Sequence, residues 1–351
     1  MAPSWIALSA FMPWIVFRQR TRTRAAVAAF TYFAAASAPI PWIAEDPATG
    51  IGLLITASAV LTTPWIVLWT EDAAQRFWRI PSALFLSAIP PIGIIGWASP
   101  LTAAGLLYPG TGLVGLAATA LTEAIWPVHP KAIAAAILAA NLLYVPPAQP
   151  PEIKALNTTD RPDTFQKEES ARQAVHHSNS DLTVLPEGAV RRWTEATDAF
   201  WDDTINHLQT TKRTALIGAG RPIPDSDEFN NSVLVIGASP AARFDQRIPI
   251  PVGMWKPFGP ADGVPLNLTG PGTLKVGQHR LAILICYEQL LVWPMVQSAL
   301  GSPTLIVGIS NATWTNHTYI PAAQEACLQA WSRLFGVPYV SAVNGHLNPN
   351  P

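Results

Sequence analysis

The segment RLAILICYEQLLVWP, residues 280–294, places a cysteine at the end of an unbroken apolar run. Residues 281–285 have the length and branching of a buried strand, without polar alternation. Cys286 follows at once, and residues 290–292 have the apolar grouping of a helix. Nucleophiles are often found where a strand meets a helix, and a helix N-terminus can lower the pKa of a thiol there. A small buried hydrophobic side chain is the other interpretation of Cys286.

The C-terminal part of the chain repeats this pattern of short apolar runs. Strands are expected at 181–188, 214–220, 232–239, 281–288, 303–311 and 338–343. Amphipathic helices are expected at 194–209 and 322–336. Strands that alternate with helices predict an α/β domain, and about 200 residues is enough for one hydrophobic core.

Residues 1–150 have a different composition, because only 12 of the 45 charged side chains of the 351-residue chain lie there. Its apolar stretches are 4–17, 25–44, 51–69, 80–98, 101–126 and 132–147, of which the first and last are short. A bilayer core takes about 20 apolar residues as a helix, so these stretches predict a polytopic α-helical membrane domain of about six spans over residues 1–147. A linker at 148–154 then leads to the α/β domain at 155–351.

The basic residues of the N-terminal part lie in every second connection: Arg18, Arg20, Arg22 and Arg24, then Arg76 and Arg79, then Lys131. The connections between them carry no Lys or Arg, so the basic connections are expected on the cytoplasmic side. Six crossings would then place the C-terminal domain outside, in the periplasm of a Gram-negative cell. The expected location is the bacterial inner membrane, multi-pass, without a cleavable signal peptide.

Several functional classes find little support in the sequence. A net charge of −1 gives no reason to expect nucleic acid, and two cysteines are too few for a disulfide framework or a zinc cluster. The segment PGTGLVG (109–115) has the spacing of a dinucleotide loop but lies in an apolar stretch, which favours close helix packing. His176 and His177 lie in a polar stretch that predicts a solvated loop. Neither a metal nor a cofactor is therefore expected.

Three strand ends carry side chains that are candidates for chemistry. Glu187 follows LTVLP, Cys286 follows LAILI, and Ser310 and Asn311 follow LIVGI. Active sites of α/β folds gather at the carboxyl ends of strands, where a carboxylate near a thiol can take its proton and later return it. A solvated turn residue is the alternative interpretation of Glu187.

The motifs LTVLPEG, LAILICYEQ and GISNATW together resemble the nitrilase, or carbon–nitrogen hydrolase, superfamily. The apolar N-terminal part makes the resemblance closer to the apolipoprotein N-acyltransferase type, and among these to the plasmid conjugal-transfer TraB family. The resemblance implies an αββα sandwich and an acyl-enzyme thioester on Cys286, with Glu187 as general base and the Tyr287 N–H in an oxyanion hole. It also implies a membrane lipid as acyl donor, an amine or protein as acceptor, and the conjugation machinery as partner.

The chain departs from this family at its catalytic lysine. The matching stretch RFDQRIPIPVGMWKPFG places Gln246 at the lysine position, with Arg247 one residue later and Lys256 ten residues later. Lys256 is the candidate third catalytic residue, and Arg247 is the other possible replacement. Losing one charge-assisted donor commonly costs about 3–4 kcal/mol of transition-state stabilisation.

Two functions stay open at this stage. The first is a periplasm-facing acyltransferase or amidase, and the second is a catalytically impaired scaffold that supports conjugal transfer through protein interactions. A transporter has little support, since charged residues are nearly absent from the apolar stretches. Trp255 and Trp314 are expected to wall an acyl cleft or to pack in the core, and Cys327 is expected to be a packing residue. The chain ends soon after its last expected strand, so the domain is expected to be short or incomplete there.

Overall fold

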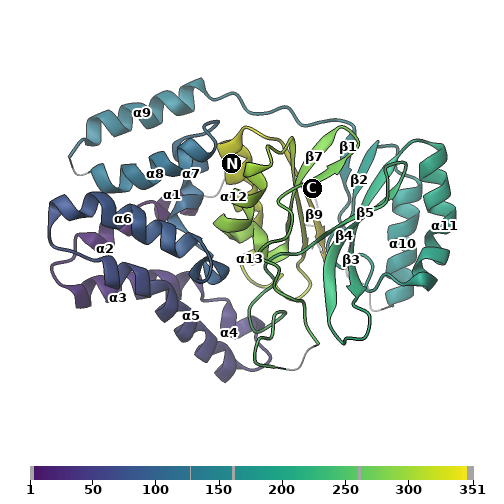
Figure 1. Ribbon diagram of the computed structural model, residues 1–351, viewed down its shortest axis with the longest axis horizontal. Helices are drawn as coiled ribbons and strands as arrows, with labels where there is room; N and C mark the ends of the chain where they lie inside the picture. Colours follow the sequence, from purple (N-terminus) through teal and green to yellow (C-terminus); the bar gives the residue numbers. More distant parts are fainter. Residues whose placement is uncertain (1–3, 127, 160–162, 260–261, 346–351) are drawn as a thin grey trace. The chain divides into compact units, whose positions relative to one another are not determined.

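The computed structural model describes residues 4–126, 128–159, 163–259 and 262–345, and these divide into two compact units (Figure 1). The first unit contains Met1–Pro147 together with Leu290–Ala299 and Ala322–Val337. The second contains Ala148–Gln289, Leu300–Pro321 and Pro338–Pro351. Two helices from the C-terminal part of the chain therefore group with the N-terminal helices.

The first unit is helical. Its α-helices are α1 (Ser4–Ser9), α2 (Met12–Phe17), α3 (Arg22–Ala36), α4 (Ile40–Ile43), α5 (Pro47–Leu68), α6 (Ala73–Ala88), α7 (Ala104–Leu107), α8 (Leu113–Ile125), α9 (Pro130–Leu143), α12 (Val292–Leu300) and α13 (Ile320–Phe335). Two short 3₁₀ helices are η1 (Ile92–Ile95) and η2 (Pro100–Ala103). Side-chain caps begin α3 and α5, because Thr21 accepts from the Arg24 N–H and Asp46 accepts from the Thr49 N–H.

Two helical stretches of the described chain are long and apolar enough to cross a membrane, namely Arg22–Ile43 and Pro47–Leu68. Ile6–Phe17, Leu113–Ile125 and Pro130–Leu143 are apolar but shorter. The expected span at 80–98 is interrupted after Ala88, and the one at 101–126 is divided among η2, α7 and α8. Pro90 and Pro91 follow the first break, and Pro109 lies between α7 and α8, where a residue without an N–H cannot continue a helix.

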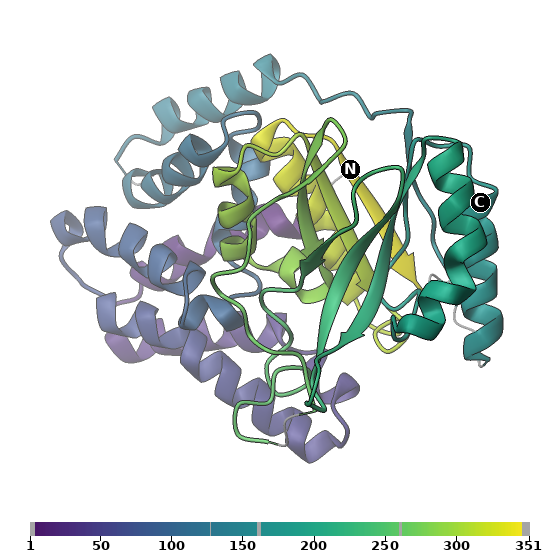
Figure 2. The same cartoon turned by 45° about the vertical axis from the view of Figure 1, so that its right-hand side comes forward.

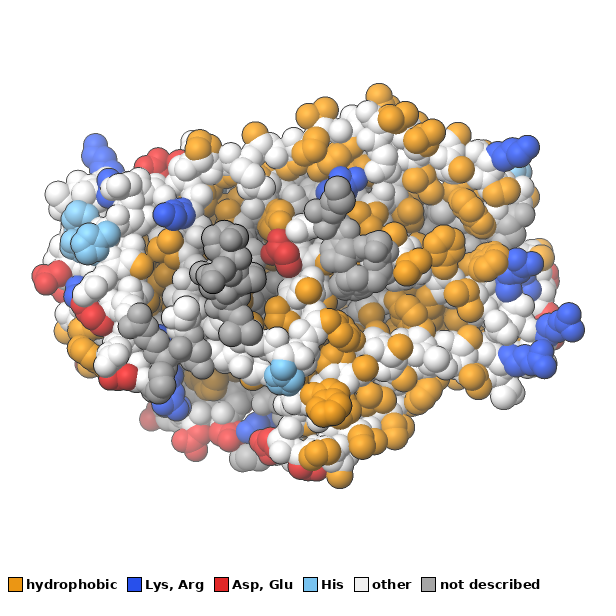
Figure 3. Space-filling model, turned by 180° about the vertical axis from the view of Figure 1, so that it is seen from behind, with side chains coloured by type: hydrophobic (Ala, Val, Ile, Leu, Met, Phe, Trp, Pro, Cys, Tyr) orange, Lys and Arg blue, Asp and Glu red, His pale blue; other side chains and the backbone are white. Residues whose placement is uncertain are grey.

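Large apolar side chains are exposed mainly on the N-terminal helices. Of the 27 exposed large hydrophobic residues in the described chain, 21 lie between Leu8 and Val145. In Figure 3, hydrophobic side chains are spread over much of the right-hand part of the view, with other side chains and backbone between them. Extensive exposed apolar surface is typical of a face that meets lipid or another protein.

The glycines of PGTGLVG serve close packing within the first unit. The Gly110 and Gly112 N–H groups donate to the Arg333 and Leu334 carbonyls at the end of α13, at 2.7 and 2.8 Å. A Cβ at Gly115 would lie 2.7 Å from a Leu334 methyl group. The N–H groups that a phosphate would need are therefore occupied by main-chain carbonyls.

The second unit contains two sheets. The first sheet has the order β1-β2-β3-β4-β5, with β1 (Ile153–Ala155), β2 (Leu182–Val184), β3 (Thr214–Pro222), β4 (Phe229–Gly237) and β5 (Ala242–Asp245). The second has the order β6-β7-β8-β9, with β6 (Leu274–Val276), β7 (His279–Ile285), β8 (Leu305–Asn311) and β9 (Tyr339–Asn344). All six expected strands are present, whereas β1, β5 and β6 were not expected from the sequence.

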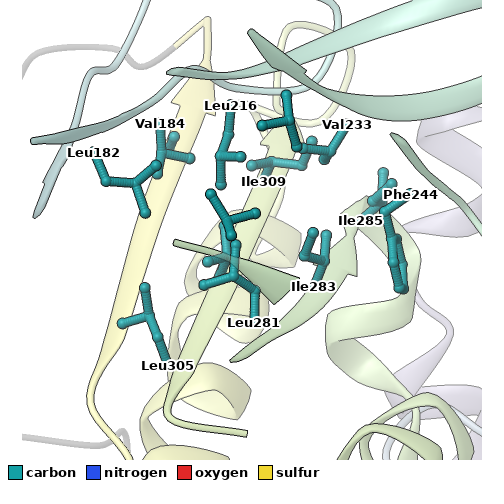
Figure 4. Packing of buried hydrophobic residues seen from close by; sticks show 14 of the residues in the cluster. Leu182, Val184, Leu216, Val233, Phe244, Leu281, Ile283, Ile285, Leu305 and Ile309 are labelled. Atoms are coloured by element: carbon teal, nitrogen blue, oxygen red, sulfur yellow. The ribbon is translucent and has the colours of Figure 1, made fainter. Parts of the chain in front are cut away.

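The two sheets pack face to face across one apolar core (Figure 4). Val184, Leu216 and Phe244 of the first sheet meet Ile283 and Ile309 of the second. The opposite face of the first sheet is covered by α10 (Thr164–His176) and α11 (Glu195–Thr210), which lie side by side (Figure 2). The second unit thus has a helical layer and two sheets, and the expected α/β class is confirmed for it.

Candidate active site

Cys286 lies where β7 ends and a short 3₁₀ helix, η3 (Cys286–Leu290), begins. Its φ is +52°, in the left-handed region that non-glycine residues rarely adopt. The residue is buried, with 3% of its surface exposed. Strained backbone of this kind clusters at functional sites, and here it turns a side chain at the carboxyl end of a parallel strand. The predicted strand-to-helix junction is therefore present.

Glu187 follows β2, and its side chain lies next to Cys286. Its Oε1 accepts from Asn231 Nδ2 at 2.6 Å, and its Oε2 accepts from the Asn311 N–H at 2.8 Å. A side-chain hydrogen bond also joins Glu187 to Cys286. The structure thus brings together the carboxyl group, the thiol and the strand end at Asn311, all three of which the sequence singled out. The solvated-turn interpretation of Glu187 is wrong, since Glu187 is buried.

The site favours uncharged forms of both groups. Burial raises the pKa of Glu187, against the bonds from Cys286, Asn231 and the Asn311 N–H that lower it. Burial also raises the pKa of the Cys286 thiol well above its usual range, and the nearby charge of Glu187 adds to this. The N–H groups of Asn311 and Tyr287 act in the opposite direction on that thiol. When Glu187 is ionised, its hydrogen bond to Cys286 makes it the direct acceptor for the thiol proton.

Gln246 is the residue that the sequence alignment above places at the lysine position of the family that this chain resembles. It follows β5, is buried, and its Oε1 accepts from Asn231 Nδ2 at 2.9 Å. Its Nε2 donates to the Ile285 carbonyl at 3.1 Å and to the Ile248 carbonyl at 3.4 Å. Gln246 is thus linked to Glu187 through Asn231, without a charge of its own.

Arg247 does not serve as the missing cation at Glu187. Its side chain and that of Glu288 are both fully buried, and their Nε and Oε1 atoms are 3.2 Å apart. The Glu288 carboxylate also accepts from the main-chain N–H groups of Arg247, Ile248 and Ile285. The glutamate of the CYE motif therefore ties the chain after β5 to the turn that carries Cys286.

Lys256 lies in the loop after β5, where its Nζ donates to Asp262 Oδ1 at 2.8 Å. This partly exposed ion pair, rather than a bond to Glu187 or Cys286, is the contact of Lys256 in the described chain. Lys256 and Trp255 line a cavity of about 350 Å³ together with Glu228. The position of Lys256 gives no support to its assignment as the third catalytic residue.

The remaining residues that the sequence singled out include Cys327, Trp314 and His176. Cys327 is buried in α13, and both cysteines are thiols rather than partners in a disulfide. Trp314 is 37% exposed. His176 ends α10 instead of lying in a loop, and its ring stacks on that of His207. Within the described residues, no cluster of His, Cys, Asp or Glu could hold a metal ion.

Asn231 is the site residue that sequence reasoning missed. It lies in β4 just before Ser232, where the expected strand began. Its pairing with Gly220 in β3 aligns it with the carboxyl end of the sheet. Asn230 and Asn231 are adjacent polar residues before an apolar run, and only the hairpin register shows which of the two faces inward.

These features define an α/β protein with a buried thiol–carboxyl pair at the carboxyl ends of its strands. The chain is 35% identical over 350 residues to a probable conjugal transfer protein TraB of Sinorhizobium fredii, covering 93% of this chain and 89% of that protein. It is 31% identical over 348 residues to the conjugal transfer protein TraB of Agrobacterium fabrum, covering 89% and 81%. The chain belongs to the TraB family of conjugal transfer proteins, as its motifs predict.

Solved structures with weaker similarity include an amidase from Nesterenkonia, with 16% identity and a TM-score of 0.41 over 55% of this chain and 75% of that one. A carbon–nitrogen hydrolase from Helicobacter pylori has 14% identity and a TM-score of 0.42 over 54% and 72%. No family model matches the chain.

Proposed function

We propose that the second unit carries a carbon–nitrogen hydrolase-type acyl-transfer centre, in which Cys286 forms a thioester and Glu187 moves the proton. The observation that carries the proposal is the direct hydrogen bond between a buried carboxyl group and a cysteine at positive φ. A structural thiol needs neither a buried carboxyl partner nor a strained backbone.

The chemistry would proceed in two balanced steps. Cys286 Sγ attacks the acyl carbonyl while its proton passes to Glu187, and the leaving group departs with that proton. An acceptor amine then attacks the thioester, and its proton returns through Glu187 to the Cys286 sulfur. The Tyr287 N–H lies next to the sulfur and is the proposed donor to the oxyanion.

The proposed acyl donor is a membrane lipid, and the acceptor is an amine or protein. The exposed apolar surface of the N-terminal helices supports a membrane location. We place the chain in the bacterial inner membrane as a multi-pass protein with its second unit in the periplasm. Its role in conjugal transfer would involve the conjugation machinery, in line with the names of its relatives.

Intact-protein mass spectrometry tests the thioester. The purified full-length chain is incubated with vesicles of phosphatidylethanolamine and measured with and without hydroxylamine. We expect a mass gain of one acyl chain that hydroxylamine removes and that Cys286→Ala abolishes. Cys327→Ala is the matched control and should retain the adduct. An adduct that persists in Cys286→Ala, or none in the wild-type chain, would overturn the proposal.

A catalytically impaired scaffold is the second candidate function. Gln246 favours it, since an amide supplies no charge for a thiolate or an oxyanion. Conjugation frequency separates the two functions: a scaffold predicts that Cys286→Ala transfers the plasmid like wild type while a deletion does not. A thioester that forms only after Gln246→Lys would also favour the scaffold.

A further inference from the structure

Asn231 joins Glu187 to Gln246. Its Nδ2 donates to Glu187 Oε1 at 2.6 Å and to Gln246 Oε1 at 2.9 Å, and all three side chains are buried. An NH₂ group has two hydrogens, so each of the two oxygens can receive one. Asn231 therefore holds the carboxyl group and the amide at a fixed separation.

Gln246 extends this connection to the nucleophile. Its Nε2 donates to the carbonyl of Ile285, the residue before Cys286, and to the carbonyl of Ile248. Any displacement of Gln246 would move the peptide unit that sets the direction of the thiol. The two amides thus form a continuous path from the carboxyl group of Glu187 to the main chain at Cys286.

The surroundings of Glu187 contain no direct cation among the described residues. Its hydrogen-bond partners are the Asn231 amide, the Asn311 N–H and the Cys286 thiol. The remaining charge that acts on it is that of Glu288, which is paired with Arg247. Neutral donors therefore provide the stabilisation that an ammonium group would otherwise supply.

We propose that Asn231 and Gln246 are an uncharged positioning pair, which aligns Glu187 with Cys286 through hydrogen bonds in place of a cation. The inference rests on the proposed acyl-transfer centre, but it concerns residues that direct the reacting groups rather than touch a substrate. It predicts that the pH at which Cys286 becomes reactive depends on both amides, because they act on Glu187, the partner of the thiol.

The rate of alkylation of Cys286, measured against pH, reports the reactivity of the thiol without an acyl substrate. The full-length chain is treated with iodoacetamide over a range of pH, and peptide mapping separates Cys286 from Cys327. The inflection of interest is the ionisation of Glu187, because only the carboxylate can take the thiol proton. Asn231→Ala removes a donor to that carboxylate, so we expect this inflection to rise by about one to two pH units and the rate near neutral pH to fall about tenfold or more. Gln246→Lys adds a cation and should move the inflection downward.

Asn230→Ala is the matched control, because it alters the neighbouring β4 residue and should leave the profile unchanged. The proposal is overturned if Asn231→Ala behaves like this control, or if Gln246→Lys leaves the inflection in place. If circular dichroism shows that Asn231→Ala does not fold, the near-isosteric Gln246→Glu decides: an upward shift supports the proposal and an unchanged profile overturns it.

An infrared titration of the Glu187 carboxyl band, assigned with Glu187→Gln, detects the same shifts where the reagent does not reach the buried thiol. Both readouts are independent of lipid. Shifted profiles without any acyl adduct would therefore support the positioning pair and count against the proposed function alone.

Discussion

Glu187 is a carboxyl group held in a place that favours its protonated form. Burial raises its folded-state pKa above 4.5, so the folded protein binds this proton more tightly than the unfolded chain does. The stability linked to Glu187 is fully present below pH 4.5 and is lost as the pH rises through the raised folded pKa. Between mildly acidic and neutral pH, wild type should therefore lose stability relative to Glu187→Gln.

Chemical unfolding of the purified chain, followed by tryptophan fluorescence at several pH values, checks this expectation. The free energy of unfolding of wild type, measured relative to that of Glu187→Gln, should fall as the pH rises. Glu195→Gln, on the exposed first turn of α11, is the control and should run parallel to wild type. Parallel profiles for Glu187→Gln as well would show that Glu187 ionises in the folded protein as easily as in the unfolded chain.

At the level of elements, the Arg247–Glu288 pair connects the chain after β5 to η3. Removing one partner of a fully buried ion pair leaves an uncompensated charge and commonly costs about 3–5 kcal/mol. Arg247→Met should destabilise the fold by that order. Adding Glu288→Gln should recover part of the loss, because the amide oxygen can still accept from the Arg247 and Ile248 N–H groups, which bond to one carboxylate oxygen, while the lone buried charge is gone.

Chemical unfolding of the two single variants and the double variant measures this coupling. Lys256→Met breaks an exposed ion pair instead and should change the free energy of unfolding little. A double variant that loses as much as the sum of its single changes would show that the two charges do not stabilise each other.

The same elements show what could be predicted from the sequence. The runs before Glu187, Cys286 and Asn311 are continuous and apolar, as buried strands are. Parallel pairing of β7 with β8 brings Cys286 and Asn311 together, and the packing of the first sheet on the second brings Glu187 to them. Asn231 and Gln246 reach the site through antiparallel pairs, in which a shift of one residue reverses the face of every side chain. Register of this kind depends on long-range pairing, so their roles required the structure.

At the scale of the whole molecule, the proposed membrane location makes the side on which Cys286 lies depend on the number of crossings. With two crossings, by Arg22–Ile43 and Pro47–Leu68, the residues after 148 lie on the same side as Arg76 and Arg79, which is cytoplasmic by charge. For the residues after 148 to lie in the periplasm, the chain needs an odd number of crossings in addition to these two. The apolar helices α8 and α9 are each roughly 20 Å long, shorter than the ~30 Å hydrocarbon core, so their flanking residues would have to contribute.

Alkaline phosphatase fusions decide between these arrangements, because the enzyme is active only outside the cytoplasm. For the proposed periplasmic domain we expect activity from a fusion after residue 150 and none from fusions at Arg20 or Arg76. A fusion after 150 that is inactive, with a cytoplasmic fluorescent reporter that is bright at the same position, would place the thiol in the cytoplasm. Cys286 would then meet the cytoplasmic leaflet, and a periplasmic acceptor would be ruled out.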